Sequence, residues 1–598
     1  MDDSDALRGR ELSLAALRRA YRDDGLSPRQ LMGELLARAR ALNPRYHLYI
    51  HLLDEAALEP FLAALDDRDP ASLPLYGIPF AIKDNIDLAG SPTTAACPAF
   101  AYRPERSARV VQRLIELGAI PTGKTNLDQF ATGLNGQRSP YGGCPNPWHL
   151  DYPSGGSSSG SALALSLRLA SFALGTDTAG SGRVPAALNG LVGCKPTRGL
   201  ISIAGVVDCC RSLDCVSLFA HQAAEAAELL ALTAQYEAAE PWSRRNPAWN
   251  AAPVAAAPAP FRFGLPRAGQ LQWLGCEESP QLFEQARRQL EALGGTAVDI
   301  DFAPFMEAAS LLYSPAGTAE RQAGFGDFVA QRPEAVLPVI REVLGVSAQA
   351  SAVERVRFSQ RLAELKQACD LALDGVDTLL MPTVPRYFSI AQIQAEPVLR
   401  NSELGLYTNF VNLLDYAAVA VPTAAMRNGL PWGVTLLGRA FTDQYLLALA
   451  GALQQRPALS GARPGDRLRV VVCGAHLQGL ALNHQLTARD ARLVQRTQTA
   501  PRYRLLALPG GPPLRPALVR AETGRAIEVE VWELPSTEMG SFLAGIGAPL
   551  GLGKVELADG RFETGFICEH GALEGAEDIS HHGGWRRWLA ARAALPTT

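Results

Sequence analysis

Two glycine-rich loops decide the fold of this chain: Pro153-Ser-Gly-Gly-Ser-Ser-Ser-Gly-Ser-Ala162 and Gly175-Thr-Asp-Thr-Ala-Gly-Ser-Gly-Arg-Val-Pro185. They enclose one apolar segment, residues 163–174. Glycine lets backbone N–H groups approach a substrate closely, and successive N–H groups in a turn form an anion-binding concavity. A serine in such a turn has a nucleophile and an oxyanion hole in one place. Flexible linkers would not enclose an apolar run, and the loops lack the Gly-Lys-Ser/Thr ending of a nucleotide P-loop.

A serine hydroxyl needs a base before it can act as a nucleophile at neutral pH. Histidine is the usual base, but the four histidines of residues 1–455 do not lie in a glycine-rich loop or at a predicted strand end; they are His47, His51, His149 and His221. A lysine whose pKa is lowered by burial is the alternative. Lys83 follows the apolar run 76–82 and precedes Asp84. It is therefore the candidate base, although a lysine at a strand end is more often a solvent-facing residue.

Four segments together resemble the amidase signature family: Gly77-Ile-Pro-Phe-Ala-Ile-Lys-Asp-Asn85, Gly123-Lys-Thr-Asn126, residues 155–162 and residues 177–185. Their order and spacing match, and the resemblance covers about residues 10–455. It implies an α/β fold in which helices cover a mixed central sheet. The alternation of predicted strands and helices in the first half of the chain also favours a layered α/β core.

The resemblance assigns a role to each residue of a serine–serine–lysine triad. Ser181 is the nucleophile, Ser157 is the bridging serine preceded by a cis peptide bond, and Lys83 is the base. Neutral Lys83 accepts a proton from Ser157, which accepts one from Ser181, and the same relay returns a proton to the leaving amine. The oxyanion hole would be formed by four backbone N–H groups, those of Thr178, Ala179, Gly180 and Ser181.

Composition narrows the class of protein. The chain has 598 residues, which predicts more than one domain, and a net charge of −4, which does not favour nucleic-acid binding. No apolar run reaches membrane-spanning length, and the acidic start Met-Asp-Asp-Ser-Asp is unlike a signal peptide. The ten cysteines are scattered without a Cys-x-x-Cys pair, although Cys209 and Cys210 are adjacent. We therefore expect a cytoplasmic enzyme with reduced thiols, no metal and no cofactor.

The pattern of apolar residues predicts helices throughout residues 10–66, including a second helix over 29–42 that Ser27 caps. It predicts the first strand within residues 74–87 and an amphipathic helix over 106–118. Further core strands are expected at 378–383 and 417–422.

The domain boundaries follow from a change in composition. We predict an amidase signature domain over residues 1–455, a linker rich in proline and glycine over 456–467, and a smaller domain over 468–598. The last domain is predicted to be rich in strands, at 468–474, 517–519, 527–532 and 566–568.

Tyr313 and Arg321 are the candidate substrate-binding residues. Pro315 and Gly317 lie between them, so Tyr313 is expected to precede a helix that carries Arg321 in its first two turns. Arginine binds carboxylates through two parallel hydrogen bonds. A structural ion pair of Arg321 with Glu320 or another acid is the alternative. The segment 312–321 resembles the carboxylate-binding segment of allophanate hydrolases, except that Gly317-Thr318 replaces a pair that commonly contains an aromatic residue.

The last domain also resembles that of allophanate hydrolases, at residues 474–486 and 549–553, and looks like a small barrel of the γ-glutamyl cyclotransferase type. This resemblance implies cleavage of allophanate to ammonia and N-carboxycarbamate, with the last domain assisting the loss of carbon dioxide. We choose His476, at the end of an apolar strand, as the acid for that step, and His484 as the reserve. The alternative is that His476 only binds a backbone carbonyl.

Three other functions stay open at this point: an amidase of another specificity, a glutamine-dependent amidotransferase A-type subunit, and an inactive amidase-like scaffold whose last domain binds a partner. Ammonia release from allophanate, glutamine and simple amides would separate them. We expect a small-molecule substrate, a homodimer, a functional link to a urea carboxylase, and no nucleic-acid or membrane partner.

Overall fold

The computed structural model describes residues 9–254, 259–455, 467–511, 513–535, 538–568 and 573–594. The chain divides into two compact units, Met1–Leu459 and Ser460–Thr598, which are described separately below. The predicted linker 456–467 lies outside the described residues, apart from Arg467, which begins a strand. None of the described helices is both long and apolar enough to cross a membrane.

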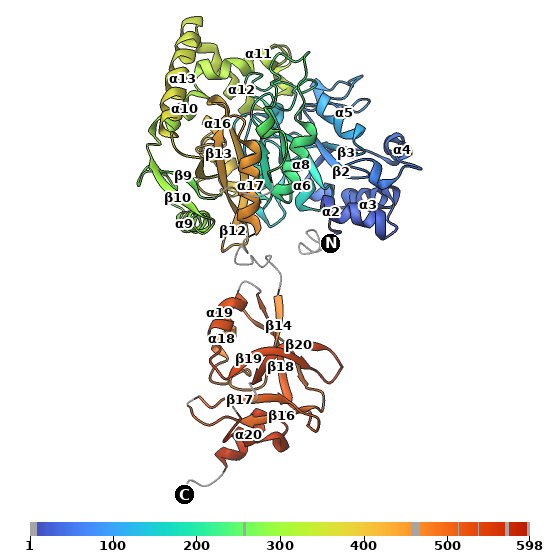
Figure 1. Ribbon diagram of the computed structural model, residues 1–598, viewed down its shortest axis with the longest axis vertical. Coiled ribbons are helices and arrows are strands. Elements are labelled where there is room, and N and C mark those ends of the chain that lie inside the picture. Colours follow the sequence, from blue (N-terminus) through green and yellow to red (C-terminus); the bar gives the residue numbers. More distant parts are fainter. Residues whose placement is uncertain are drawn as a thin grey trace. The chain divides into compact units, whose positions relative to one another are not determined.

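The first unit is built on one mixed sheet of eleven strands in the order β1-β3-β2-β6-β8-β7-β12-β13-β11-β9-β10 (Figure 1). Strands β2, β3 and β6 are parallel neighbours, whereas β8 runs antiparallel to β6. The α/β class predicted from the sequence is confirmed. The strands are β1 (Tyr49–Leu52), β2 (Pro79–Lys83), β3 (Ile120–Thr125), β6 (Phe172–Asp177), β7 (Val192–Lys195), β8 (Cys215–Ala220), β9 (Phe261–Pro266), β10 (Gly295–Ile300), β11 (Thr378–Pro382), β12 (Tyr416–Ala425) and β13 (Pro431–Arg439).

Helices surround this sheet (Figure 1). Many begin at a serine or aspartate whose side chain accepts a backbone N–H of the first turn; Ser27, as predicted, caps α3 in this way. The helices are α2 (Leu14–Asp23), α3 (Pro28–Tyr46), α4 (Glu55–Ala63), α5 (Arg109–Glu116), α6 (Ser159–Ser166), α7 (Arg183–Leu188), α8 (Ala223–Thr233), α9 (Glu278–Glu291), α10 (Ala303–Leu311), α11 (Pro315–Gln331), α12 (Pro338–Gly345), α13 (Ala352–Ala372), α14 (Ile390–Ala395), α15 (Leu399–Leu404), α16 (Asn409–Leu413) and α17 (Asp443–Gln455).

The prediction that residues 10–66 are entirely helical is wrong at β1. Helix α3 ends at Tyr46, and the following residue, His47, has a left-handed backbone conformation with φ 49°. Residues Tyr49–Leu52 then extend along β3 and pair with it in antiparallel fashion. A strand of four residues is too short to show a clear alternation of apolar and polar residues. Its conformation is determined by pairing with the edge of the sheet rather than by local propensity. The strands predicted within 74–87, 378–383 and 417–422 are confirmed as β2, β11 and β12.

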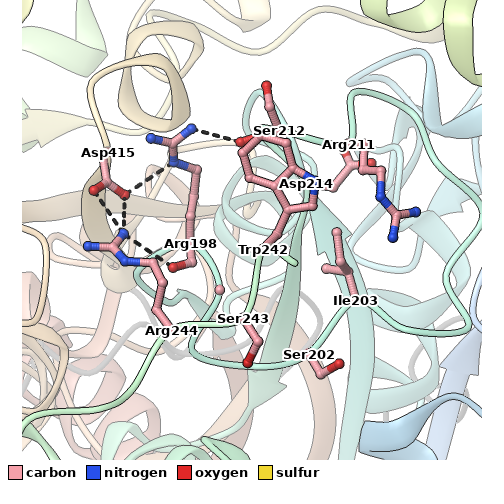
Figure 2. A pocket seen from close by; sticks show the side chains of 11 residues that line it. Arg198, Ser202, Ile203, Arg211, Ser212, Asp214, Trp242, Ser243, Arg244 and Asp415 are labelled. Carbon is pink, nitrogen blue, oxygen red and sulfur yellow. Dashed lines mark hydrogen bonds and ion pairs between the residues drawn. The ribbon is translucent and has the colours of Figure 1, made fainter. Parts of the chain in front are cut away.

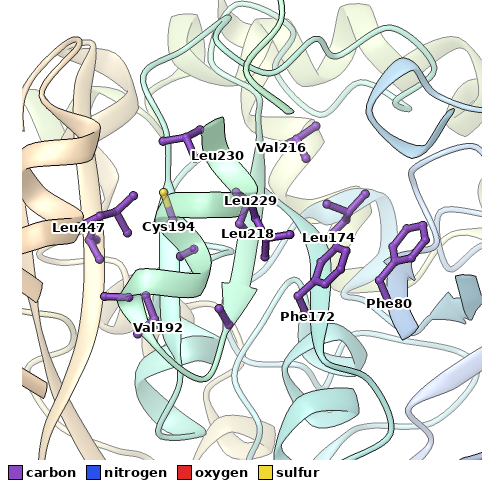
Figure 3. Close-up of a cluster of buried hydrophobic side chains, with 14 of the residues drawn as sticks. Phe80, Phe172, Leu174, Val192, Cys194, Val216, Leu218, Leu229, Leu230 and Leu447 are labelled. Atoms are coloured by element: carbon purple, nitrogen blue, oxygen red, sulfur yellow. The ribbon is translucent and has the colours of Figure 1, made fainter. Parts of the chain in front are cut away.

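Helices α8 and α17 pack against each other over the middle of the sheet (Figure 3). Leu229 of α8 and Leu447 of α17 contribute to one buried cluster with side chains of the central strands. In β2 and β6 the rings of Phe80 and Phe172 stack with centroids 5.3 Å apart. Burying each such side chain contributes about 1.5–3 kcal/mol to the free energy of unfolding. The strand ends that carry the site described below are therefore held by a rigid core.

The second unit has a five-stranded sheet in the order β15-β18-β14-β20-β19 and a three-stranded sheet in the order β17-β16-β21. All four strands predicted here are confirmed, as β14, β17, β18 and β20. The elements are β14 (Arg467–Val472), α18 (His484–Thr487), β15 (Arg492–Gln498), β16 (Tyr503–Ala507), β17 (Pro516–Arg520), β18 (Glu528–Pro535), α19 (Met539–Ala544), β19 (Leu550–Glu556), β20 (Phe562–Cys568), β21 (Glu577–Asp578) and α20 (Trp585–Ala593).

Candidate active site

Lys83 ends strand β2, and its side chain is fully buried. Because β2 and β6 run parallel, their carboxyl ends lie at the same edge of the sheet. The Nζ atom lies 2.7 Å from Ser157 Oγ, in the loop before α6, and 2.7 Å from Thr176 Oγ1, in β6. The structure therefore brings the predicted base and the predicted bridging serine into direct contact.

Burial lowers the pKa of Lys83 to about 7, because its ammonium form has lost the solvation of water. The charges of Cys209 and of three aspartates act in the opposite direction but do not compensate for the loss. A large fraction of Lys83 is consequently neutral at neutral pH. Its lone pair can then accept a proton, which is the requirement for a general base.

Ser157 follows a cis peptide bond from Gly156, as the resemblance implies. Its carbonyl oxygen accepts the N–H of Asp128 at 3.1 Å. The buried Asp128 carboxylate in turn accepts the backbone N–H groups of Gly136 and Arg138. The loop built around Asp128 thus holds the Ser157 segment in place beside the end of β2.

Ser181 lies beside this pair but does not complete the predicted relay in the described structure. The N–H of Ser158 donates to the Ser181 carbonyl at 3.3 Å, so the two loops are in contact. Ser181 Oγ donates to the carbonyl of Gly133 at 3.4 Å, and the described residues show no hydrogen bond between the hydroxyls of Ser181 and Ser157. Proton transfer therefore requires the Ser181 hydroxyl to rotate away from the Gly133 carbonyl and to donate to Ser157 Oγ. Catalytic hydrogen bonds often tighten only when substrate is bound.

The predicted oxyanion segment is shaped by Asp177. Its carboxylate accepts the N–H of Gly180 at 2.8 Å and that of Gly182 at 3.1 Å, and it forms a bidentate pair with Arg183 at 2.9 Å. Burial alone would raise the pKa of Asp177, but the Arg183 guanidinium brings it below its usual value. The Gly180 amide is thus already occupied. Within the described chain, the other three predicted donors make no hydrogen bond: the N–H groups of Thr178, Ala179 and Ser181.

Arg321 is a fully buried cation without an ion-pair partner among the described residues. It lies in the first two turns of α11, as predicted, and its guanidinium carbon is 4.9 Å from the centroid of the Tyr313 ring. Its Nε and Nη1 atoms are buried and have no hydrogen-bond partner in the described part of the chain. Glu320 instead binds Ser212 and, at 2.9 Å, Arg355, so the alternative of an Arg321–Glu320 ion pair does not hold.

A buried guanidinium without a partner is costly, because the charge has lost its water and gained nothing in return. An anionic ligand would remove this cost. Leu312 and Ala316, on either side of the start of α11, pack in one buried cluster with Ala179 of the oxyanion segment, and Tyr313 packs against it. The predicted nucleophile and the predicted carboxylate-binding residues are therefore in one region of the first unit.

Three residues near Lys83 and the oxyanion segment were not predicted from the sequence: Thr176, Asp214 and Cys209. Thr176 contacts Lys83 through the register of β2 and β6. Asp214 accepts the hydroxyl of Thr178 and the N–H of Cys209, and burial first, then Cys209, raises its pKa to about 8. Thr176 lies directly before Asp177 in the second glycine-rich loop, so the sequence could have indicated its role. Asp214 and Cys209 lie in a loop that contains no recognisable motif.

A cavity of about 280 Å³ adjoins the loop that carries Asp214 (Figure 2). Figure 2 shows Arg198 and Arg244 directed at the carboxylate of Asp415, which binds both, while Trp242 forms part of the wall. Asp214 lines this cavity and also accepts the hydroxyl of Thr178, so this one residue connects the cavity with the oxyanion segment. The described residues hold no group of three or more histidine, cysteine, aspartate or glutamate side chains suited to a metal ion.

His476 lies in the second unit. It is half-buried, its Nε2 is 2.9 Å from Oε1 of Gln485, and its ring stacks on Phe566 with centroids 5.0 Å apart. Burial lowers the pKa of His476. It lines a small cavity of about 40 Å³ together with Arg515. The ring nitrogen of His476 thus binds a side chain, whereas His484 is the histidine that binds a backbone carbonyl, that of Ala481 at 2.9 Å.

Comparison with known sequences decides the family. The Amidase profile matches residues 30–447, more than half of the chain, and the profile named Allophanate hydrolase C-terminal domain matches residues 468–590. The chain belongs to the amidase family. The resemblance drawn from the four signature segments is therefore confirmed, as is the fold that it implied.

Two kinds of curated relative are similar to this amidase. The urea amidolyase of Lachancea kluyveri is 40% identical over 586 residues, which cover 93% of this chain and 32% of that protein. The chain thus spans about a third of the length of the curated urea amidolyases it matches. The A-type subunit of the glutamyl-tRNA(Gln) amidotransferase from Acidobacterium capsulatum is 32% identical over 73% of this chain and 97% of that protein.

Comparison with solved structures agrees with these sequence matches. The allophanate hydrolase of Kluyveromyces lactis is 36% identical to this amidase, with a TM-score of 0.71, and the match covers 97% of this chain and 99% of that chain. The urea amidolyase of the same organism also matches with a TM-score of 0.71 and 36% identity, over 97% of this chain and 37% of that chain.

Proposed function

We propose that this amidase hydrolyses allophanate to ammonia and N-carboxycarbamate. The observation that carries the proposal is the buried Arg321, which has no anionic partner among the described residues, in a site that also contains Lys83, Ser157 and Ser181. Allophanate supplies what this arrangement lacks, namely one carboxylate beside a cleavable amide. The match to an allophanate hydrolase over nearly its whole length supports the same substrate.

Acylation begins when neutral Lys83 takes the proton of Ser157, which takes the proton of Ser181. Ser181 Oγ bonds to the terminal carbonyl carbon of allophanate, and the oxyanion is stabilised by the free backbone N–H groups of residues 178–181. The carbon–nitrogen bond then breaks. The proton held by Lys83 returns through Ser157 to the leaving nitrogen, which departs as ammonia.

Deacylation repeats the sequence with water as the nucleophile. Water attacks the acyl carbon, loses its proton to the relay, and releases N-carboxycarbamate while Ser181 regains its hydrogen. Throughout, Arg321 and Tyr313 bind the carboxylate of the substrate and so fix the reacting carbonyl against Ser181. A bidentate guanidinium contact contributes orientation as well as binding energy.

We infer that the second unit acts on the product. N-carboxycarbamate carries two carboxylates on one nitrogen; protonation of that nitrogen breaks one carbon–nitrogen bond and releases carbon dioxide, leaving carbamate. His476 is the proposed acid, because it is half-buried beside Arg515 in a small cavity. Its lowered pKa makes it neutral at pH 7, and a bound dianion would raise that pKa and charge the ring.

The proposal also covers the oligomeric state of the enzyme, its location in the cell and the source of its substrate. We propose a cytoplasmic homodimer that receives allophanate from a urea carboxylase. The support for this supply is that the urea amidolyases extend well beyond the region matched by this chain. A glutamine-dependent amidotransferase A-type subunit is the second candidate, favoured by the 32% identity to such subunits, but their match covers only 73% of this chain.

The experiment compares allophanate with biuret, a neutral analogue in which an amide replaces the carboxylate. Arg321→Ala should lower kcat/KM for allophanate by about 30- to 5,000-fold, corresponding to about 2–5 kcal/mol for a desolvated charge contact. The loss on biuret should be small, and Arg321→Lys should recover part of the activity on allophanate. Equal losses on the two substrates would contradict a carboxylate-binding role.

A further inference from the structure

We propose that the cavity of about 280 Å³ shown in Figure 2 is a second ligand site, which binds a small aromatic carboxylate and thereby slows turnover at the amidase site. The cavity takes no part in the mechanism above. Its volume is just below that of pockets for drug-sized ligands, about 300–1,000 Å³, so a ligand of one or two rings fits it. Binding is independent of the proposed function, and only the activity readout rests on it.

The anion-binding end of the cavity is formed by Arg198, Arg244 and Asp415. Both guanidinium groups donate to the Asp415 carboxylate, Arg198 through Nε at 3.1 Å and Arg244 through Nη1 at 2.9 Å, so two positive charges share one negative charge. The Arg244 guanidinium also packs on the Phe441 ring, 4.4 Å from its centroid, which fixes its plane. Within the described chain, Arg198 Nη2 and Arg244 Nε and Nη2 make no hydrogen bond. A carboxylate that accepts from these nitrogens balances the remaining charge.

The apolar part of the cavity wall favours a flat ligand. Trp242 lines the cavity and is 46% exposed, although tryptophan is mostly buried in folded proteins. Ile203 is a second apolar lining residue. An aromatic ring stacks on indole in an offset arrangement and covers this exposed surface. The third lining arginine, Arg211, already binds Asp208 and Glu240, so its charge is balanced and the anion belongs at the other end of the cavity.

Asp214 transmits the effect of the ligand to the oxyanion segment. It lines the cavity, and its carboxylate accepts the Thr178 hydroxyl and the N–H groups of Cys209 and Cys210. The ionised form of a carboxyl group is the form that such donors stabilise. A ligand carboxylate nearby disfavours that form, because two like charges repel each other. The ligand therefore weakens the hydrogen bond that holds Thr178 and slows the step that needs the oxyanion segment.

The test measures binding of three compounds of similar size by titration calorimetry at pH 7: benzoate, its neutral isostere nitrobenzene, and cyclohexanecarboxylate, which is charged but not flat. Benzoate should bind about tenfold or more tightly than nitrobenzene, as hydrogen bonds to a charged group imply. It should bind about 2- to 10-fold more tightly than cyclohexanecarboxylate, because only benzoate stacks on Trp242. Arg244→Gln should remove the first preference and Trp242→Ala the second. Trp249→Ala is the matched control, since Trp249 is 76% exposed and does not line this cavity.

Benzoate is also attracted to Arg321, and two measurements separate the sites. Arg321→Gln should keep the benzoate binding that depends on Arg244. At saturating allophanate, benzoate should lower kcat about fivefold or more in the wild type but not in Arg244→Gln, whereas competition at Arg321 raises only KM.

The inference is overturned if nitrobenzene binds as tightly as benzoate, if benzoate binding is lost in Arg321→Gln but unchanged in Arg244→Gln, or if bound benzoate leaves kcat unchanged. Calorimetry does not depend on turnover. The predicted binding in an enzyme inactive on allophanate would refute the proposed substrate alone.

Discussion

The two units differ in the surroundings that they give to the proposed base and the proposed acid. In the first unit Lys83 is fully buried at the edge of an eleven-stranded sheet, and its pKa falls to about 7. In the second unit His476 is only half-buried between aromatic rings, and burial lowers a pKa whose ordinary value is about 6.5. A lysine needs a large rigid core to become a base at pH 7, whereas a histidine needs only a small pocket.

Lys124 shows that burial alone does not make a base. It lies in β3, paired with Ile82, the residue before Lys83 in β2, and it is as buried as Lys83. Its Nζ is 3.3 Å from Asp84 Oδ1 and donates to Thr93. Among the described residues, Lys83 has only hydroxyl partners and no carboxylate in contact. This difference in partners separates the proposed base from its structural neighbour.

The largest effect is expected from Ser181→Ala. The change removes the proposed nucleophile and no core packing, so kcat should fall by about 10⁶-fold, as for other serine nucleophiles, while the thermal unfolding temperature stays close to that of the wild type. Ammonia release and a thermal melt measure the two quantities. Residual turnover close to that of the wild type would show that another group attacks the substrate.

The next effect separates the two buried lysines. Lys83→Met should lower kcat/KM by about 10²–10⁴-fold, the usual contribution of a general base. In the wild-type enzyme only neutral Lys83 is active, so kcat/KM should fall as pH decreases through about 7. Lys124→Met should instead lower stability, by about 3–5 kcal/mol, because it leaves Asp84 buried without its partner. A rate that does not change as the pH crosses the pKa of Lys83 would exclude a lysine base.

The smallest effect concerns the second unit. His476→Ala should leave the first ammonia release unchanged and slow the release of carbon dioxide, since the proposed acid acts only on the product. His484→Ala is the matched control and should change neither rate, because that ring binds the Ala481 carbonyl. Ammonia and carbon dioxide followed together measure the partition. A wild-type ratio and rate in His476→Ala would remove this histidine from the reaction.

The sequence predicted the parts of the site that lie in short continuous motifs. Ser157 and Ser181 were identified because their glycine loops resemble the amidase signature, and Arg321 because its segment resembles the carboxylate-binding segment of allophanate hydrolases and follows Tyr313 and a helix start. Contacts between distant segments were not predictable in the same way. Arg355 forms an ion pair with Glu320, so Glu320 is not a partner of Arg321. This ion pair depends on the packing of α11 against α13.

The same reason explains the missed features in the loops and at the sheet edge. The contact of Thr176 with Lys83 needs the register of two strands that lie far apart in the sequence. The Asp177 carboxylate accepts a hydrogen bond from the Gly180 N–H in a turn whose geometry no residue pattern specifies. Strand β1 exists because an edge of the sheet is available to it.

The most direct test of the proposed function is the specificity of the unmodified enzyme for three substrates. Ammonia release from allophanate, biuret and glutamine gives kcat/KM for each. The buried Arg321 predicts that allophanate exceeds biuret by about 30-fold or more, the value of one desolvated charge contact, and that glutamine is the poorest substrate. A kcat/KM for biuret equal to that for allophanate, or a higher value for glutamine, would contradict the account.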